Sequence, residues 1–296
     1  MISGDWVKSM NVPFKLGVIT DEVTQDIFEA ARFCEKHSLD CMEVRSVNGN
    51  SPFDFTEADI SDINNASKQY GLTVCSISAP LFKCDFDDEN QVKMQIDQFE
   101  KCAEYANRIG AKMIRGFDFW RCGASVDARA EKYERIVEIC KERGIICVIE
   151  ADPSVNSNTP ELTAELVKKI NSPYVKVLFD PGNEIWVTGK ASDDAYDSVK
   201  DNLAHIHIKD AKIVNGKPDG VKIGTGLVNY KKLFKRLTDD GYNGNVMLET
   251  HYRKNIGLTD EQLKRPGGND FSLGAYEASE ESIVELIKII KSCQED

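Results

Sequence analysis

Short apolar runs alternate with longer amphipathic segments along this chain, eight times in succession. Each apolar run has the length of a buried strand, and near-continuous apolar strands joined by helices indicate a parallel sheet covered on both faces. The expected strands, each followed by its expected helix, are 14–20 with 24–36, 40–45 with 56–70, 72–78 with 89–108, 111–116 with 125–142, 145–150 with 160–170, 174–180 with 191–200, 203–210 with 230–240, and 245–251 with 276–291.

Eight strand–helix pairs within 296 residues predict an α/β fold, a (β/α)8 TIM barrel, as a single domain over residues 1–296. Gly71, Gly110, Gly144 and Gly241 each follow an expected helix and precede the next strand, as left-handed helix caps do. An open doubly wound sheet is the alternative. No GxGxxG follows the first strand, which argues against a dinucleotide-binding version of that sheet.

Composition narrows the class of protein and of partner. Hydrophobic residues make up 41% of the chain and charged residues 29%, as in ordinary globular proteins. A net charge of −12 disfavours nucleic acid and anionic membranes as partners. The first fifteen residues contain no uninterrupted apolar run, so no secretory signal is expected. The nine cysteines form no CxxC and include Cys34, Cys75, Cys140 and Cys147 in apolar segments, which indicates buried reduced thiols and a cytoplasmic protein.

Four neighbouring expected strands end in residues that bind metals. These residues are Glu150, Asp180, His207 and Glu249. Barrels of this kind carry their chemistry at the carboxyl ends of the strands. Three carboxylates converging there would repel one another unless a cation neutralised them, and three oxygens with one imidazole suit manganese, magnesium, cobalt or zinc. In HIHIKD, His205 stands one layer deeper than His207, where it orients that ligand or simply packs.

Other polar and aromatic side chains at or just beyond strand ends are expected to line a substrate pocket. They are Glu43, Arg115, Trp186, Lys209 and Arg253, with Lys209 and Arg115 nearest the substrate oxygens. The long segment 252–275 follows the last strand and carries several basic residues. Connections of this length are usually functional or disordered, so it is either a lid over the substrate or a solvated insertion at an oligomer contact.

Five stretches carry a resemblance to a known family. VIEADP, VLFDPGN, HIHIKD, IGTGLVNYKKLFKRL and NVMLETHYR resemble the sugar phosphate isomerase/epimerase group of xylose isomerase-like barrels, over roughly residues 14–292. The resemblance implies a (β/α)8 barrel and one divalent metal ion held by Glu150, Asp180, His207 and Glu249. It also implies that Glu150 and Glu249 serve as an acid/base pair.

The chain departs from the family pattern in two places. Family epimerases usually carry a histidine three residues after the sixth-strand aspartate, where it holds a substrate oxygen, and this chain has Asn183 there. Asn183 is therefore expected to bind substrate, since an amide can form the hydrogen bond, but it cannot exchange a proton near neutral pH. The ketohexose 3-epimerase branch has an arginine shortly after the seventh-strand histidine, and this chain offers Lys209 and Lys212. These departures leave the substrate open.

The predicted function is a divalent-metal-dependent isomerase or epimerase, with manganese as the expected ion, acting on a sugar, sugar phosphate, keto-sugar or cyclitol. The reaction would begin with proton abstraction beside a metal-polarised carbonyl and pass through an enediolate. A metal-dependent lyase or dehydratase shares this first half and is the alternative, as is a non-catalytic sugar-binding barrel. Four histidines and an acidic chain disfavour a DNA-gripping trizinc endonuclease. The sequence is compatible with a homo-oligomer.

Overall fold

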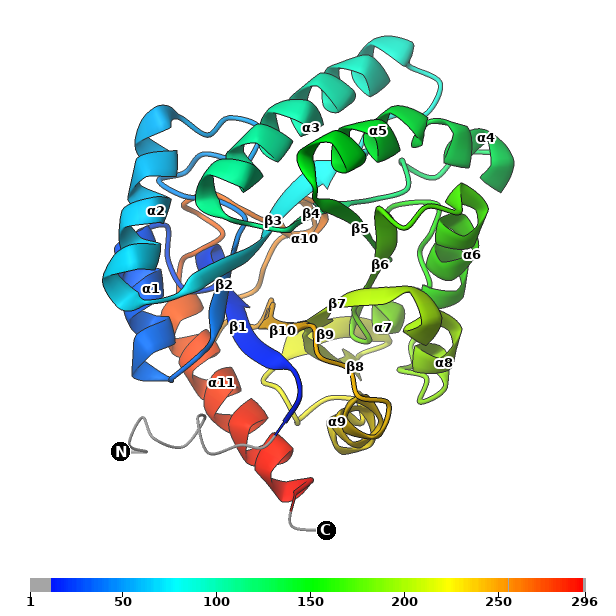
Figure 1. Ribbon diagram of the computed structural model, residues 1–296. Coiled ribbons are helices and arrows are strands. Elements are labelled where there is room, and N and C mark those ends of the chain that lie inside the picture. The colour runs from blue at the N-terminus through cyan, green and yellow to red at the C-terminus, as the bar shows by residue number, and fades with distance from the viewer. Residues whose placement is uncertain (1–11, 255, 295–296) are drawn as a thin grey trace.

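The computed structural model describes residues 12–254 and 256–294, and over these ranges the chain forms one closed barrel of eight parallel strands. Helices surround the strands on the outside (Figure 1). The predicted single-domain (β/α)8 barrel is confirmed. Around the barrel the strand order is β1-β10-β7-β6-β5-β4-β3-β2. The barrel strands are β1 (Lys15–Ile19), β2 (Cys41–Val44), β3 (Thr73–Leu81), β4 (Met113–Gly116), β5 (Ile146–Glu150), β6 (Val175–Phe179), β7 (Leu203–Ile208) and β10 (Asn245–Leu248).

The helices begin and end largely where local sequence signals place them. Thr56 and Asp59 form a capping box at the start of α2, and Gly71, Gly110 and Gly144 end their helices in the left-handed conformation. The helices are α1 (Ile27–Lys36), α2 (Glu57–Tyr70), α3 (Glu89–Ile109), α4 (Val126–Glu131), α5 (Glu134–Arg143), α6 (Pro160–Ile170), α7 (Asn183–Thr188), α8 (Ala195–Val199), α9 (Tyr230–Asp239), α10 (Asp260–Lys264) and α11 (Ala275–Ser292), with 3-10 turns η1 (Thr20–Glu22) and η2 (Lys200–Asn202).

Several boundaries differ from the prediction. The expected helix 125–142 is divided into α4 and α5 at Tyr133, whose buried hydroxyl donates to the Phe117 carbonyl. The expected helix 191–200 shortens to α8 and η2, and α7 before it was not predicted.

The strand expected over 203–210 ends at Ile208. An antiparallel hairpin comes next, made of β8 (Asp210–Val214) and β9 (Lys217–Val221). Asn215 and Gly216 form its turn with positive φ angles of 51° and 77°, as a type I′ turn requires.

Side chains fill the lower half of the barrel interior. Cys41, Cys75 and Met247 pack there with apolar residues from four other strands. Gly17 on β1 makes room for them, because a Cβ at this position would lie 2.4 Å from the Met247 Cε atom and from the Cys41 carbonyl oxygen. The thiols expected to be buried are buried, and no disulfide joins the described cysteines. The buried acidic residues that end or follow β5, β6 and β10 therefore lie above this layer, toward the carboxyl ends of the strands.

The described residues include no helix long and apolar enough to cross a membrane. The expectation that the chain start carries no secretory signal concerns mainly residues 1–11, which lie outside the described part of the chain.

Candidate metal centre and active site

The predicted metal ligands meet at one point of the barrel mouth. Glu150 ends β5, Asp180 directly follows β6, His207 lies near the end of β7, and Glu249 directly follows β10. These strands are consecutive neighbours in the closed barrel. One donor atom from each of the four side chains lies within 4.8 Å of the others. All four residues are at most 2% exposed, so the cluster is buried in the protein.

The donor atoms of this cluster fit a divalent cation. Within the described residues, His207 Nδ1 is buried and has no hydrogen-bond partner, and the buried atoms Asp180 Oδ2 and Glu249 Oε2 have only their ion pairs with Lys209. His207 Nδ1 instead faces two acceptors, Glu150 Oε1 and Glu249 Oε2, each 3.4 Å away. Buried polar atoms without partners are costly and uncommon, and a cation between them would satisfy all of them at once. Three carboxylates and one imidazole are a ligand set for manganese, zinc or a similar ion.

Three cationic side chains contact the same carboxylates, and the first, Arg45, places its Nη1 atom 2.5 Å from Glu249 Oε1. Arg115 places its Nη1 atom 3.0 Å from Glu150 Oε2 and 3.5 Å from Glu249 Oε1. Lys209 Nζ lies 2.7 Å from Glu249 Oε2 and 3.2 Å from Asp180 Oδ2. These contacts are ionic, and they supply part of the positive charge that the cluster needs.

The charges of the surrounding ion-pair network leave a deficit of two positive charges. In the part of the chain that the structure describes, continuous ion pairs join five buried carboxylates to four buried Lys or Arg cations. A sixth buried carboxylate, Glu43, is connected to this network through His205 and His207. With neutral histidines, a divalent cation would balance the network. The carboxylates are Asp21, Glu22, Glu43, Glu150, Asp180 and Glu249, and the cations are Arg45, Arg115, Lys209 and Arg253.

The pKa shifts point to the same deficit. Burial raises the pKa of Asp180 to about 7, and Lys209 opposes this shift. Burial alone would lower the pKa of His207, but the carboxylates of Glu43, Glu150 and Glu249 raise it well above its usual value. Both groups therefore tend to hold a proton when no metal ion is bound, which reduces the excess negative charge. Metal ligands must be deprotonated, so a cation and these protons compete for the same atoms.

A cavity of about 260 Å³ opens directly above the cluster. Four of the residues predicted to bind substrate line it, namely Arg115, Asn183, Trp186 and Lys209. Asn183 donates its amide to Glu150 Oε1 at 3.1 Å and to the Ala151 carbonyl at 2.9 Å. It therefore holds one of the proposed ligands in place as well as facing the cavity.

Glu43 and Arg253 are not among the residues that line this cavity. Glu43 lies deeper in the barrel, with its carboxylate 2.6 Å from His205 Nε2 and 3.0 Å from His207 Nε2. Arg253 binds Glu22 at 3.1 Å and donates to the Phe271 carbonyl at 2.8 Å. Both side chains thus bind groups inside the protein, and their contact with substrate stays a prediction that this geometry does not support.

Lys83, Asp152 and His251 are among the lining residues that were not predicted as site residues. Lys83 follows β3 and pairs with Asp152 at 2.8 Å. Asp152 stands two residues after Glu150, a spacing that could have indicated it. His251 stands two residues after Glu249 with φ of 44° and contacts Glu22 and Glu249 at 3.3 and 3.5 Å. A positive φ is uncommon for a non-glycine residue and is often found at functional sites.

The described residues of the segment 252–275 lie over the barrel opening and include α10 (Figure 1). Lys264 and Pro266 line the cavity, and the Lys264 carbonyl accepts a hydrogen bond from Lys83 at 2.7 Å. The ammonium of Lys264 lies 4.5 Å from the centre of the Trp120 ring. This placement supports the interpretation of the segment as a cover over the site.

The sequence profile of xylose isomerase-like TIM barrels matches residues 31–291. The chain belongs to this family. A 3-dehydroshikimate dehydratase of Bacillus anthracis is 24% identical over 212 residues, which cover 65% of this chain and 74% of the relative. An L-ribulose-5-phosphate 3-epimerase, UlaE, of Escherichia coli is 22% identical over 197 residues, which cover 62% and 67%. An uncharacterised protein of Methanocaldococcus jannaschii is 28% identical over 144 residues, and the match spans 47% of this chain and about half, 48%, of that relative.

Solved structures share the family fold. IolI with a bound zinc atom has a TM-score of 0.72 at 17% identity, covering 94% of this chain and 99% of its own. A D-allulose 3-epimerase from Methylomonas sp. in complex with D-allulose has a TM-score of 0.68 at 14% identity, covering 92% and 96%. At these identities the likeness establishes the fold. The chain therefore belongs to a family whose members include sugar epimerases and dehydratases, and it carries a buried cluster consistent with a divalent metal ion.

Proposed function

We propose that this protein is a divalent-metal-dependent epimerase or isomerase of a sugar or sugar derivative. The observation that carries the proposal is the convergence of Glu150, Asp180, His207 and Glu249 beneath a cavity of about 260 Å³. When bound by these residues, a divalent cation supplies Lewis-acid polarisation of a substrate carbonyl. Manganese is the ion we propose, and the zinc atom of the related IolI structure shows that a neighbour in fold holds a divalent metal.

Glu150 and Glu249 are suited to move a proton between the two sides of a substrate carbon. They stand on β5 and β10, which are separated in the barrel by β6 and β7, so they approach the cavity from different directions. In an epimerisation one glutamate removes the proton from the carbon beside the carbonyl and the other returns a proton to the opposite face. This requires one ionised and one protonated carboxyl group. Burial and the charge of Glu249 oppose ionisation of Glu150, but Arg115 and His207 outweigh them and hold its pKa below the usual value, so the delivering glutamate must gain its proton during the reaction.

Other residues that line the cavity hold the two glutamates in place or stabilise negative charge that develops on the substrate. Asn183 fixes Glu150 through its amide, and Arg115 contacts both glutamates. Lys209 is a buried ammonium beside Asp180 and Glu249, where it can stabilise the negative charge of an enediolate. Trp186 offers an apolar wall to a sugar ring.

A dehydratase is the second candidate, favoured by the 24% identity to the 3-dehydroshikimate dehydratase over 212 residues. The same proton abstraction would begin this reaction. A hydroxyl group on the next carbon would then leave as water after accepting a proton, and a double bond would form in the substrate. The two candidates diverge only after the proton has been removed, so product analysis separates them.

Isotope exchange in D2O tests the proposal. The protein loaded with Mn²⁺ is incubated with D-allulose, D-fructose or 3-dehydroshikimate, and substrate and product are analysed by mass spectrometry. An epimerase yields an epimer whose mass changes only by the solvent deuterium it gains, whereas a dehydratase yields a product lighter by one water. Glu150→Gln and Glu249→Gln should each lower turnover by at least about 10²–10⁴-fold, the typical worth of a general base. Glu142→Gln, which alters an exposed glutamate, is the matched control.

The two variants should also differ from each other. A variant lacking the delivering glutamate can still exchange deuterium into the starting sugar, whereas one lacking the removing glutamate cannot. Starting from the other epimer, these roles should be reversed. Near-normal turnover in both variants would refute the two-glutamate mechanism.

A further inference from the structure

We infer that Glu43 is a positioning residue of the metal centre. Its carboxylate fixes the proton of His207 on Nε2, so that the lone pair of Nδ1 faces the other ligands. The inference rests on the proposed function only through the metal site. It assigns to Glu43 a role different from the substrate contact predicted from sequence.

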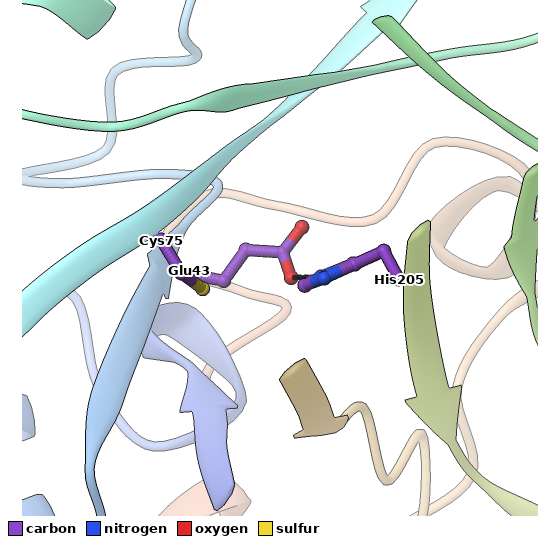
Figure 2. A group of neighbouring side chains, drawn as sticks. All are labelled: Glu43, Cys75 and His205. Atoms are coloured by element: carbon purple, nitrogen blue, oxygen red, sulfur yellow. Dashed lines mark hydrogen bonds and ion pairs between the residues drawn. The ribbon is translucent and has the colours of Figure 1, made fainter. Parts of the chain in front are cut away.

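Glu43 reaches across the barrel interior from β2 to the histidines of β7 (Figure 2). A single oxygen, Oε2, lies 2.6 Å from His205 Nε2 and 3.0 Å from His207 Nε2. Ser78 donates its hydroxyl to the other oxygen, Oε1. All four residues are at most 1% exposed, so water does not compete for these contacts. The carboxylate is therefore held from three sides in one orientation.

These contacts determine the tautomer of His207. An ionised carboxylate can only accept hydrogen bonds, so the Nε2 atom in contact with it must carry the hydrogen. In a neutral imidazole, Nδ1 then has a free lone pair. Nδ1 lies 3.4 Å from Glu150 Oε1 and from Glu249 Oε2, and it has no hydrogen-bond partner. The other tautomer would place a hydrogen on Nδ1, which could bind Glu150 or Glu249 and would remove the metal ligand.

Metal-bound histidines commonly donate a hydrogen bond from their second ring N–H to a carboxylate, and loss of that carboxylate typically lowers metal affinity by about 10–100-fold. Here the carboxylate serves two histidines. His205 contributes a second donor to the same oxygen and thus helps to hold Oε2 below His207. The pair explains why HIHIKD has imidazoles at alternate positions of one strand, where both side chains point into the barrel.

Glu43, His205 and Cys75 lie close enough together to suggest a metal site of their own (Figure 2). The contacts favour the supporting role. Glu43 and His205 already bind each other, and the Cys75 thiol lies 3.3 Å from the Met42 carbonyl oxygen, to which it donates. Burial raises the pKa of Cys75 well above its usual value, so the thiolate that a metal would need is disfavoured.

The tautomer can be measured directly on the wild-type protein. The chain has four histidines, so a long-range ¹H–¹⁵N spectrum of the zinc-loaded protein contains few imidazole signals to assign. We expect His207 to carry its proton on Nε2 and to bind zinc through Nδ1. Zinc on Nε2, or a proton on Nδ1, would overturn the inference. This measurement needs no altered residue in the barrel interior, so it remains decisive if a Glu43 variant does not fold.

Calorimetry with Zn²⁺ and Mn²⁺ provides the second test. Glu43→Gln should weaken binding of each ion by about 10–100-fold. Asp59→Asn is the matched control, because it removes a buried carboxylate at the start of α2 that binds Thr56, Asn48 and Asn50 and contacts none of the four ligands. Its metal affinity should equal that of the wild type. If the wild type binds neither ion, the metal site of the proposed function is wrong. If the wild type binds and Glu43→Gln binds as tightly, the metal site stands and the role of Glu43 is refuted.

Discussion

Replacing Lys209 by methionine should make the stability of this protein depend strongly on metal. The ammonium of Lys209 is 2% exposed and contacts Glu249 at 2.7 Å and Asp180 at 3.2 Å. Removing one partner of a buried ion pair typically costs about 3–5 kcal/mol, because the remaining charge is left without compensation. We expect a loss of this size for the metal-free variant above pH 7. Below pH 7 the loss should be smaller, since Asp180, whose pKa burial raises to about 7, can take up a proton instead.

A divalent ion should reverse much of that loss. The bound ion would supply the positive charge that Lys209 had provided. Because the variant lacks the ammonium that repels a cation, its metal affinity should be retained or increased. An ion present at 100 times its dissociation constant stabilises the folded protein by about 2.7 kcal/mol. Urea denaturation of both proteins, with Mn²⁺ and with a chelator, measures the four free energies of unfolding. Turnover of the loaded variant should fall, because the ammonium is lost from the cavity.

Lys212→Met is the control for this experiment. Lys212 is exposed on β8, and its substitution should change the free energy of unfolding by no more than about 0.5 kcal/mol. Two results together would refute this reasoning. The free energy of unfolding that Lys209→Met loses relative to the wild type would be the same with saturating metal as with chelator, and the variant would bind metal more weakly than the wild type. Lys209 would then not compensate the charge of the ligand carboxylates.

The geometry supports three further predictions. Gly182→Ala should destabilise the protein by about 1–3 kcal/mol and reduce turnover, because a Cβ there would lie 2.5 Å from the Lys209 carbonyl oxygen; denaturation and kinetics test this, and wild-type values would contradict it. The metal-free protein should lose stability as pH rises from about 5 to 8, because its folded state binds more protons than the unfolded state. Burial raises the pKa of Asp180 to about 7, and neighbouring carboxylates raise the pKa of His207 against the effect of burial. Urea denaturation should show that this loss becomes smaller when Mn²⁺ is bound, and a stability that rises with pH would contradict the prediction. Cys122 is exposed, and a thiol reagent should modify it faster than the buried cysteines; mass mapping that finds Cys34 labelled equally fast would show a looser structure.

The sequence predicts the barrel well because its strands are buried on both faces. Each strand is a compact apolar run, and glycines such as Gly71 and Gly110 end the helices before the next strand begins. The β8–β9 hairpin was not predicted even though Asn215-Gly216 is a strong hairpin signal. The predicted strand 203–210 runs past the end of β7 and includes Asp210, the first residue of β8, because periodicity alone does not show where a strand leaves the barrel.

The candidate site could be predicted where a residue that can bind a metal stands at the carboxyl end of a strand. Glu150, Asp180, His207 and Glu249 follow this rule, since the closed barrel brings successive strand ends together. The depth to which a side chain reaches into the barrel cannot be predicted from its place at a strand end. Glu43 also stands near the end of its strand, yet its side chain reaches inward to the histidines of β7.

Contacts made by loops are equally hidden from the sequence. Arg253 turns away from the cavity to bind Glu22, which lies 231 positions earlier in the chain. Lys83 is held in the cavity wall by hydrogen bonds to Asp152 and to the Lys264 carbonyl, which belong to two different connections. No local pattern encodes such pairings, because they depend on how the loops fold over the barrel.

The central claim is that one divalent ion binds among four named side chains, and an anomalous difference map of crystals grown with Mn²⁺ tests it most directly. We predict one strong peak with Glu150, Asp180, His207 and Glu249 each at about 2.0–2.4 Å, the range for oxygen and nitrogen ligands of such ions. His207 should reach the peak through Nδ1. An ordered structure in which these side chains point apart, or in which the ion lies elsewhere, would contradict the claim.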